Sequence, residues 1–185
     1  MGKLIWSVNV TVDGCTDHTQ AIADAELHTY AAAVLDGAAC LLLGRISYDL
    51  LESYWPLVAR GEIADADEAQ VAFAHQLEAK PKVVASRKLD TVHWNASLIR
   101  GDLAEAVQRL KQERGDVLIF GSPGLGSALT QADLIDEHHF LIQPIAAGRG
   151  PRLFDGIARR TFRVIETQSF ASGVVKIRAQ AGERV

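Results

Sequence analysis

Short apolar runs alternate with amphipathic stretches along most of this chain. Continuous apolar runs of four or five residues, such as 39–43 and 117–120, are typical of strands buried on both faces of a sheet. Apolar residues that recur every three or four positions, most clearly in 102–114, are typical of helices. The pattern predicts strands at residues 3–10, 39–43, 82–85, 97–100, 117–120, 135–145, 161–170 and 174–180, and helices at 26–36, 45–54, 62–79, 102–114 and 123–132.

The order of these elements predicts an α/β fold. Strands that are separated by helices pair in parallel through right-handed crossovers. The last two strands are joined by a short turn at 171–173, so they add an antiparallel edge. We therefore expect a mostly parallel central sheet of about eight strands, in a single domain over residues 1–185. Pro56 is expected to end the helix at 45–54.

Composition and charge exclude several classes of function. The 185 residues carry a net charge of −4, which argues against a dedicated nucleic-acid-binding protein. There is no apolar run of about 18 residues and no charged start leading into an apolar stretch, so we expect neither a membrane partner nor a signal peptide. Two cysteines, Cys15 and Cys40, are too few for a disulfide framework or a structural zinc site. A cytoplasmic protein is what we expect.

The acidic and histidine residues at 136–139 resemble a metal site in composition only. They lie in a predicted strand, where neighbouring side chains point to opposite faces and cannot chelate one ion together. We therefore expect no metal.

The strongest local motif is a glycine-rich turn between a strand and a helix. The strand at 117–120 runs into Gly121, Ser122, Pro123, Gly124 and Leu125, and proline suits the first turn of a helix. Glycines let backbone N–H groups approach an anion, and a helix N-terminus favours negative charge. The spacing matches neither the dinucleotide fingerprint nor a Walker A motif, so phosphate binding and an ordinary tight turn both remain open.

Two further strands end in an arginine. Arg45 follows the strand at 39–43, after Gly44, and Ser86–Arg87 follows the strand at 82–85. Ligands of open α/β sheets bind at the carboxyl ends of the strands, and a guanidinium there suits a phosphate. The two sites together could bracket the ribose phosphate that distinguishes NADP from NAD. The alternative for Arg45 is a local bond to Asp49.

Several of these segments, in this order, resemble a known family. They are 11–14 (TVDG), 43–48 (LGRISY), 54–56 (YWP), 86–87 (SR), 120–122 (FGS), 134–137 (LIDE) and 144–154 (PIAAGRGPRLF). Over nearly its whole length the chain is similar to the dihydrofolate reductase fold. It is more closely similar to the reductase domain of the bifunctional riboflavin-biosynthesis deaminase–reductase and its stand-alone bacterial relatives.

The resemblance implies an NADPH-dependent reductase of a small heterocycle, with a dihydrofolate-reductase-like three-layer sandwich. The first strand would approach the nicotinamide, and the loop at 11–25 would cover the site. The residues that the resemblance assigns to the cofactor are Val8 and Asn9 at the nicotinamide, Gly44, Arg45 and Ser47 at the phosphates, Ser86 and Arg87 at the 2′-phosphate, and Gly121, Ser122, Pro123, Gly124 and Leu125 at the pyrophosphate.

The substrate side departs from the dihydrofolate reductase pattern. Those enzymes place an acidic residue early in the first helix, where this chain has His28, with Glu26 nearby. His28 could donate a proton near neutral pH, or it could be a partly exposed helical histidine. A reductase similar to 5-amino-6-(5-phosphoribosylamino)uracil reductase is the leading interpretation. Dihydrofolate reductase and a non-catalytic ligand-binding protein of this fold remain alternatives.

The resemblance also implies a homodimer. We expect the strand at 135–145, together with the last hairpin, to provide an edge that a second subunit could cover.

Overall fold

The fold is a single hydrogen-bonded sheet with helices between its strands. A computed structural model describes residues 1–184. The strands are β1 (Leu4–Thr11), β2 (Cys40–Gly44), β3 (Lys82–Ala85), β4 (Ala96–Ile99), β5 (Val117–Phe120), β6 (Glu137–Gln143), β7 (Arg160–Ser169) and β8 (Val175–Arg184). The helices are α1 (Ala25–Asp36), α2 (Arg45–Ala59), α3 (Glu68–Ala79), α4 (Leu103–Glu113) and α5 (Pro123–Gln131), with a short 3₁₀ helix η1 (His18–Gln20).

The sheet has eight strands in the order β4-β3-β2-β5-β1-β6-β8-β7. β3 pairs in parallel with β2 and β4, and β1 pairs in parallel with β6. β8 runs antiparallel to both β6 and β7. A mostly parallel sheet of eight strands with an antiparallel C-terminal edge was predicted, and this fold class is confirmed.

The chain divides into two compact units, which we describe separately. The first contains residues 1–2 and 23–118, and the second contains residues 3–22 and those from 119 onward. The prediction of one domain over residues 1–185 therefore stays a prediction.

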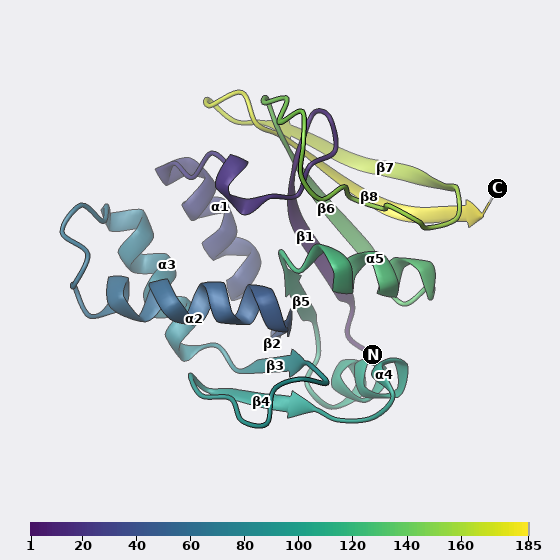
Figure 1. The fold of residues 1–185 in the computed structure, drawn as a ribbon, viewed down its shortest axis with the longest axis horizontal. Helices are drawn as coiled ribbons and strands as arrows, with labels where there is room; N and C mark the ends of the chain where they lie inside the picture. Colours follow the sequence, from purple (N-terminus) through teal and green to yellow (C-terminus); the bar gives the residue numbers. More distant parts are fainter. Residues whose placement is uncertain (185) are drawn as a thin grey trace. The chain divides into compact units, whose positions relative to one another are not determined.

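In the first unit, three helices pack together beside the short parallel strands. α1 and α2 both contact α3, and α2 also contacts β2 and β3 (Figure 1). The apolar side chains of β2 are completely buried, as its unbroken apolar run indicates. α3 begins with a reciprocal cap in which Asp67 accepts from the Gln70 amide and the Gln70 side chain accepts from the Asp67 amide.

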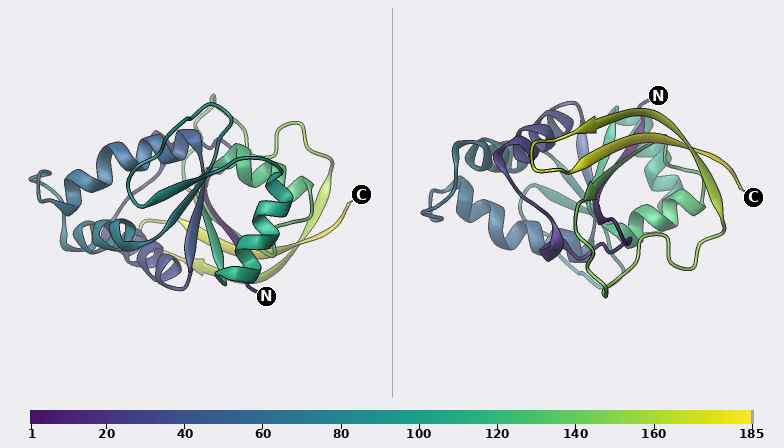
Figure 2. Two further views of the ribbon diagram at one scale, coloured as in Figure 1. Left: turned by 90° about the horizontal axis from the view of Figure 1, so that it is seen from below. Right: turned by 90° about the horizontal axis from the view of Figure 1, so that it is seen from above.

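In the second unit, β7 and β8 form a long hairpin that extends the β1–β6 pair (Figure 2). One face of these strands carries an aromatic cluster around Trp6, whose ring meets those of His138, Phe140 and Phe154 edge-on. α5 packs on this face, because Thr130 of α5 bonds to His138 of β6 at 3.0 Å.

Five expectations about individual elements were wrong. Pro56 does not end α2, which continues to Ala59 and buries Val58. The helix expected at 62–79 starts only at Glu68, after the Asp67 cap. β6 is shorter than expected, whereas β8 continues to Arg184. β6 is also not an edge, since β1 and β8 flank it and β7 is the terminal strand.

Candidate functional site

In the first unit, the carboxyl ends of β2 and β3 lie next to each other. Gly44 pairs with Ala85 in the parallel register, so Arg45 and Ser86 are the next residues on both strands. The structure thus makes the two strand ends neighbours, and the binding role of their side chains stays a prediction. Gly44 is also the N-cap of α2, which puts the first turn of that helix at the same edge.

Arg45 forms the local bond that was its alternative interpretation. Its Nη1 lies 3.0 Å from Asp49 Oδ2, one turn along α2, and both side chains are roughly 40% exposed. Exposed pairs of this kind contribute little, about 0–1 kcal/mol, so the guanidinium is readily available to another anion.

Ser86 shapes the loop that follows β3. Its Oγ accepts hydrogen bonds from the backbone N–H groups of Lys88 and Leu89, both at 3.1 Å, which leaves the hydroxyl proton to donate elsewhere. Arg87 is exposed. Ser47, the remaining predicted residue of this unit, lies half-buried in the first turn of α2.

In the second unit, the turn between β5 and α5 has an unusual backbone. Gly121 and Ser122 are both left-handed, with φ of 63° and 48°. The Gly121 N–H donates to the Ser7 carbonyl at 2.8 Å, and the Trp6 indole N–H donates to the Gly121 carbonyl at 2.7 Å. Pro123 has no N–H, and the N–H groups of Gly124 and Leu125 come before the first intrahelical bond of α5, from Gly126 to Ser122, so they have no carbonyl partner within the helix.

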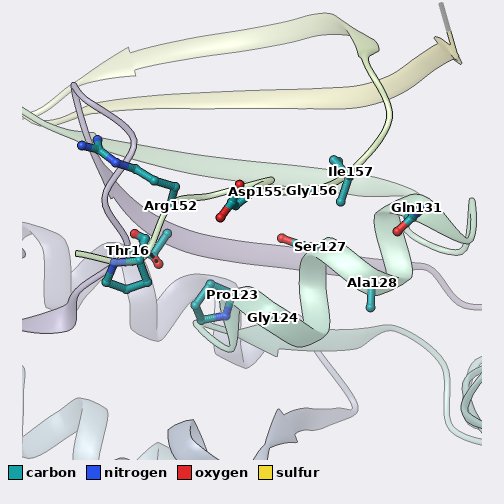
Figure 3. Close-up of a pocket in the computed structure, with 11 residues that line it drawn as sticks. Thr16, Pro123, Gly124, Ser127, Ala128, Gln131, Arg152, Asp155, Gly156 and Ile157 are labelled. Carbon is teal, nitrogen blue, oxygen red and sulfur yellow. Dashed lines mark hydrogen bonds between the residues drawn. The ribbon is translucent and has the colours of Figure 1, made fainter. Parts of the chain in front are cut away.

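A pocket of about 360 Å³ lies beside this helix, entirely within the second unit (Figure 3). Its volume is within the range of small-molecule sites. Ser127 turns its hydroxyl toward the space between α5 and the loop at 151–157. The pocket is lined by Pro123, Gly124, Ser127, Ala128 and Gln131 of α5, by Pro151, Arg152, Asp155, Gly156 and Ile157 of that loop, and by Thr16.

Asp13 ties together the two loops that contribute to this pocket. Its carboxylate accepts from the N–H groups of Ala147 at 3.0 Å and Gly148 at 2.8 Å, and it pairs with Arg152 at 3.2 Å. The hydrogen bond from the Thr11 hydroxyl and, after it, these bonds hold the pKa of the Asp13 carboxyl well below its usual range. Up to residue 16, the loop that was expected to cover the site is thus anchored to residues 147–153.

Val8 and Asn9 of β1 were both expected near the nicotinamide, but only the side chain of Asn9 is exposed to solvent. Val8 is buried, whereas Asn9 is exposed. The Asn9 Oδ1 accepts from the side chain of Gln143, a residue that the sequence analysis did not single out. No local pattern marks Gln143, because its partners are distant in the sequence.

His28 and Glu26, the candidate catalytic residues, lie in different environments. Glu26 is exposed in the first turn of α1. His28 is 7% exposed and packs against the rings of Trp55 and Phe73, and its Nδ1 has no hydrogen-bond partner. The interpretation of His28 as a partly exposed helical histidine was wrong, because α2 and α3 cover that side of α1.

The two histidines of β6 point to opposite faces, as expected for a strand. His138 bonds to Thr130, and His139 Nε2 lies 2.9 Å from Glu137 Oε1. Burial lowers the pKa of His138 to about 4, so this ring is neutral at physiological pH. Among residues 1–184 there is no group of three or more His, Cys, Asp or Glu side chains that could hold a metal ion.

Comparisons with known proteins agree on the fold. The sequence model of the RibD C-terminal domain family matches residues 2–176. A putative riboflavin biosynthesis protein from Shewanella sp. PV-4 has a similar structure, with a TM-score of 0.73 and 19% identity over 98% of this chain and 99% of that one. A search of curated proteins finds no match.

Two longer proteins share the fold over part of their length. RibD from Acinetobacter baumannii has a TM-score of 0.71 and 15% identity over 99% of this chain, and this chain spans 59% of that RibD. A diaminohydroxyphosphoribosylaminopyrimidine deaminase/5-amino-6-(5-phosphoribosylamino)uracil reductase from Thermotoga maritima has a TM-score of 0.66 and 15% identity, over 98% of this chain and 57% of that one.

Within residues 1–184, none of the helices is long and apolar enough to span a membrane.

Proposed function

Because this chain belongs to the RibD C-terminal domain family, we propose that it is an NADPH-dependent reductase of a small heterocyclic compound. Its nearest functional analogy is the 5-amino-6-(5-phosphoribosylamino)uracil reductases. The observation that carries the proposal is the Gly44–Ala85 register, which brings Arg45 and Ser86–Arg87 to neighbouring strand ends. Two guanidinium groups and a hydroxyl form a donor set that suits a phosphate dianion.

NADPH supplies the hydride, and the residues of this chain bind and orient it. Arg45, Ser86 and Arg87 would hold the 2′-phosphate, and Gly44 and Ser47 would add the first turn of α2. In the second unit, the N–H groups of Gly124 and Leu125 at the start of α5 are suited to the pyrophosphate, with Gly121, Ser122 and Pro123 fixing the turn. Val8 and Asn9 would lie at the nicotinamide.

The proton that accompanies hydride transfer has no assigned donor. His28 and Glu26 stay predictions for that role, and we give neither a step. His28 is enclosed by Trp55 and Phe73, and water can supply the proton where no side chain does.

The test is a titration of the purified protein with NADPH and NADH, before and after Arg45→Ala. A charge-assisted hydrogen bond contributes about 1.5–3 kcal/mol, so the variant should bind NADPH roughly 10- to 100-fold more weakly and NADH nearly as well as the wild type. Arg60→Ala is the matched control, because Arg60 caps the other end of α2 and pairs with Glu62 at 2.6 Å. Equal losses for both cofactors would contradict the phosphate role.

The same titration decides between the alternatives. A wild-type protein that ignores both cofactors is not a reductase, and the non-catalytic ligand-binding interpretation then replaces this one. A protein that binds NADPH and turns over dihydrofolate is a dihydrofolate reductase.

We also propose a homodimer, with β7 rather than β6 as the edge that a second copy covers. β7 is the terminal strand. Eight of its ten residues are exposed and the other two are half-buried, and the exposed ones include Val164 at 53% and Ile165 at 37%. Sedimentation as a monomer at micromolar concentration would contradict it.

A further inference from the structure

β1 presents one polar side chain at a place where an interior strand is normally covered. All eight residues of β1 are described, and Asn9 alone among them is exposed. β1 lies inside the sheet and pairs in parallel with β6. Strands in such positions are usually buried on both faces. The sheet is therefore open above Asn9.

The hydrogen bonds around Asn9 fix which end of its carboxamide faces outward. The chain of bonds starts at the backbone N–H of Ile22, which can only donate, and which bonds to Gln143 Oε1 at 2.9 Å. Gln143 is 1% exposed and must then direct its NH₂ group the other way. That group donates to Asn9 Oδ1 at 2.9 Å. The Asn9 carbonyl is thus held by Gln143.

The consequence is that Asn9 presents a donor on its exposed side. Amide oxygen and nitrogen atoms are usually assigned from their surroundings, and here the surroundings leave one consistent orientation, because it is set by a backbone N–H. The Asn9 Nδ2 group, with two protons, is left on the exposed side. A ligand that lies above β1 can meet these protons with a lone pair.

We propose that Asn9 is a specificity-determining residue that donates a hydrogen bond to a carbonyl oxygen of the bound ring, and that Gln143 is the positioning residue that holds it in that orientation. This rests on the proposed function, which supplies two sources of such an oxygen. One is the carboxamide of the nicotinamide, and the other is a ring carbonyl of the heterocyclic substrate.

Asn9→Asp isolates the donor. The aspartate keeps an oxygen that accepts from Gln143 and loses the outward N–H groups, so the variant should unfold within a few degrees of the wild type. Two probes are titrated: NADPH, and 2′-phospho-ADP-ribose, which carries the same phosphates without the nicotinamide. We expect NADPH to bind at least tenfold more weakly to the variant, while binding of 2′-phospho-ADP-ribose changes by less than threefold.

If NADPH binding is unchanged, the second source is tested with 5,6-diaminouracil, which carries two ring carbonyls, added to protein saturated with NADP⁺. A tenfold loss in this arm assigns the contact to the substrate. The proposal is overturned if Asn9→Asp loses affinity in neither arm. It is also overturned if the affinities for NADPH and for 2′-phospho-ADP-ribose fall equally, because an equal fall reports only the added negative charge. Asn9→Ala, which is neutral, repeats the comparison should Asn9→Asp not fold.

Gln143→Glu tests the positioning role. A carboxylate at 143 accepts from both Ile22 and Asn9, which turns the Asn9 oxygen outward. The ratio of NADPH to 2′-phospho-ADP-ribose affinity should fall as it does in Asn9→Asp, and an unchanged ratio would refute the role of Gln143. If the wild-type protein binds neither NADPH nor 2′-phospho-ADP-ribose, the proposed function itself is refuted. If the wild type and Asn9→Asp bind both probes equally well, only the nicotinamide contact of Asn9 is refuted.

Discussion

Gly126 is the position at which the smallest change should have the largest effect on packing. It lies in α5 directly over the Trp6 ring. A Cβ atom added there would lie 2.0 Å from Trp6 Cε2 and 2.3 Å from Cζ2. Carbon atoms in contact are ~3.5–4.0 Å apart, so α5 or the indole would have to move by about 1.5 Å. Trp6 is fully buried and its N–H is bonded to Gly121, which leaves the ring little freedom.

The size of the effect follows from two opposing contributions. Overpacking of a core costs about 1–3 kcal/mol, and this contact belongs at the upper end because a rigid ring must yield. The better helix propensity of alanine offsets about 1 kcal/mol. We therefore expect Gly126→Ala to lower the free energy of unfolding by about 2 kcal/mol, which for a chain of this length lowers Tm by roughly 4–8 °C.

Gly124→Ala is the matched control in the same helix. Nothing lies within 4 Å of the Cβ that would be added there. Its expected effect is a gain of about 0.4–1 kcal/mol from the reduced freedom of the unfolded chain. Thermal unfolding followed by circular dichroism compares the two variants with the wild type. A Gly126→Ala protein as stable as Gly124→Ala would refute the view that α5 rests on the Trp6 ring.

Two further predictions concern charged side chains. Burial lowers the pKa of Lys82 from 10.5 to about 8. Between pH 8 and pH 10.5 the unfolded chain therefore keeps a proton that the folded chain has lost, so the free energy of unfolding rises with pH. Relative to Lys82→Met, the wild type should gain about 2 kcal/mol in urea unfolding between pH 7.5 and 10, and a constant difference would contradict this. Asp13→Asn should speed hydrogen exchange at Ala147 and Gly148 at least tenfold, whereas Asp17→Asn, whose side chain bonds within its own loop, should leave both amides unchanged.

The fold class could be predicted because its determinants are local. The apolar runs of β2 and β5 and the stripe of α4 identify each element without reference to the rest of the chain. The expectations failed where a distant or reciprocal contact decides. α2 continues past Pro56 because Val58 is buried, and α3 starts late because Asp67 and Gln70 cap each other.

The candidate site divides in the same way. Arg45 and Ser86–Arg87 could be found because each follows a strand directly. Asp13 lies in the segment 11–14 that carries the resemblance, but its bonds to Ala147 and Gly148 span more than 130 residues and could not be seen locally. Gln143 acts through Ile22 and Asn9, more than 120 residues away, and nothing in its neighbourhood marks it. The burial of His28 depends on two other helices, which the periodicity of α1 does not reveal.

The path of the chain through the two units sets an order for its synthesis. β1 is made first, but its partner β6 comes much later, and the Leu4 N–H and the Asp136 carboxylate that meet at 2.6 Å are 132 residues apart. At ~5–20 residues per second, the nascent β1 waits roughly 7–26 s for β6. Residues 23–118, which are made between the two strands, form the compact unit that has its own internal contacts. The second unit, in which β1 pairs with β6, can therefore close only after the residues of the first unit have been made.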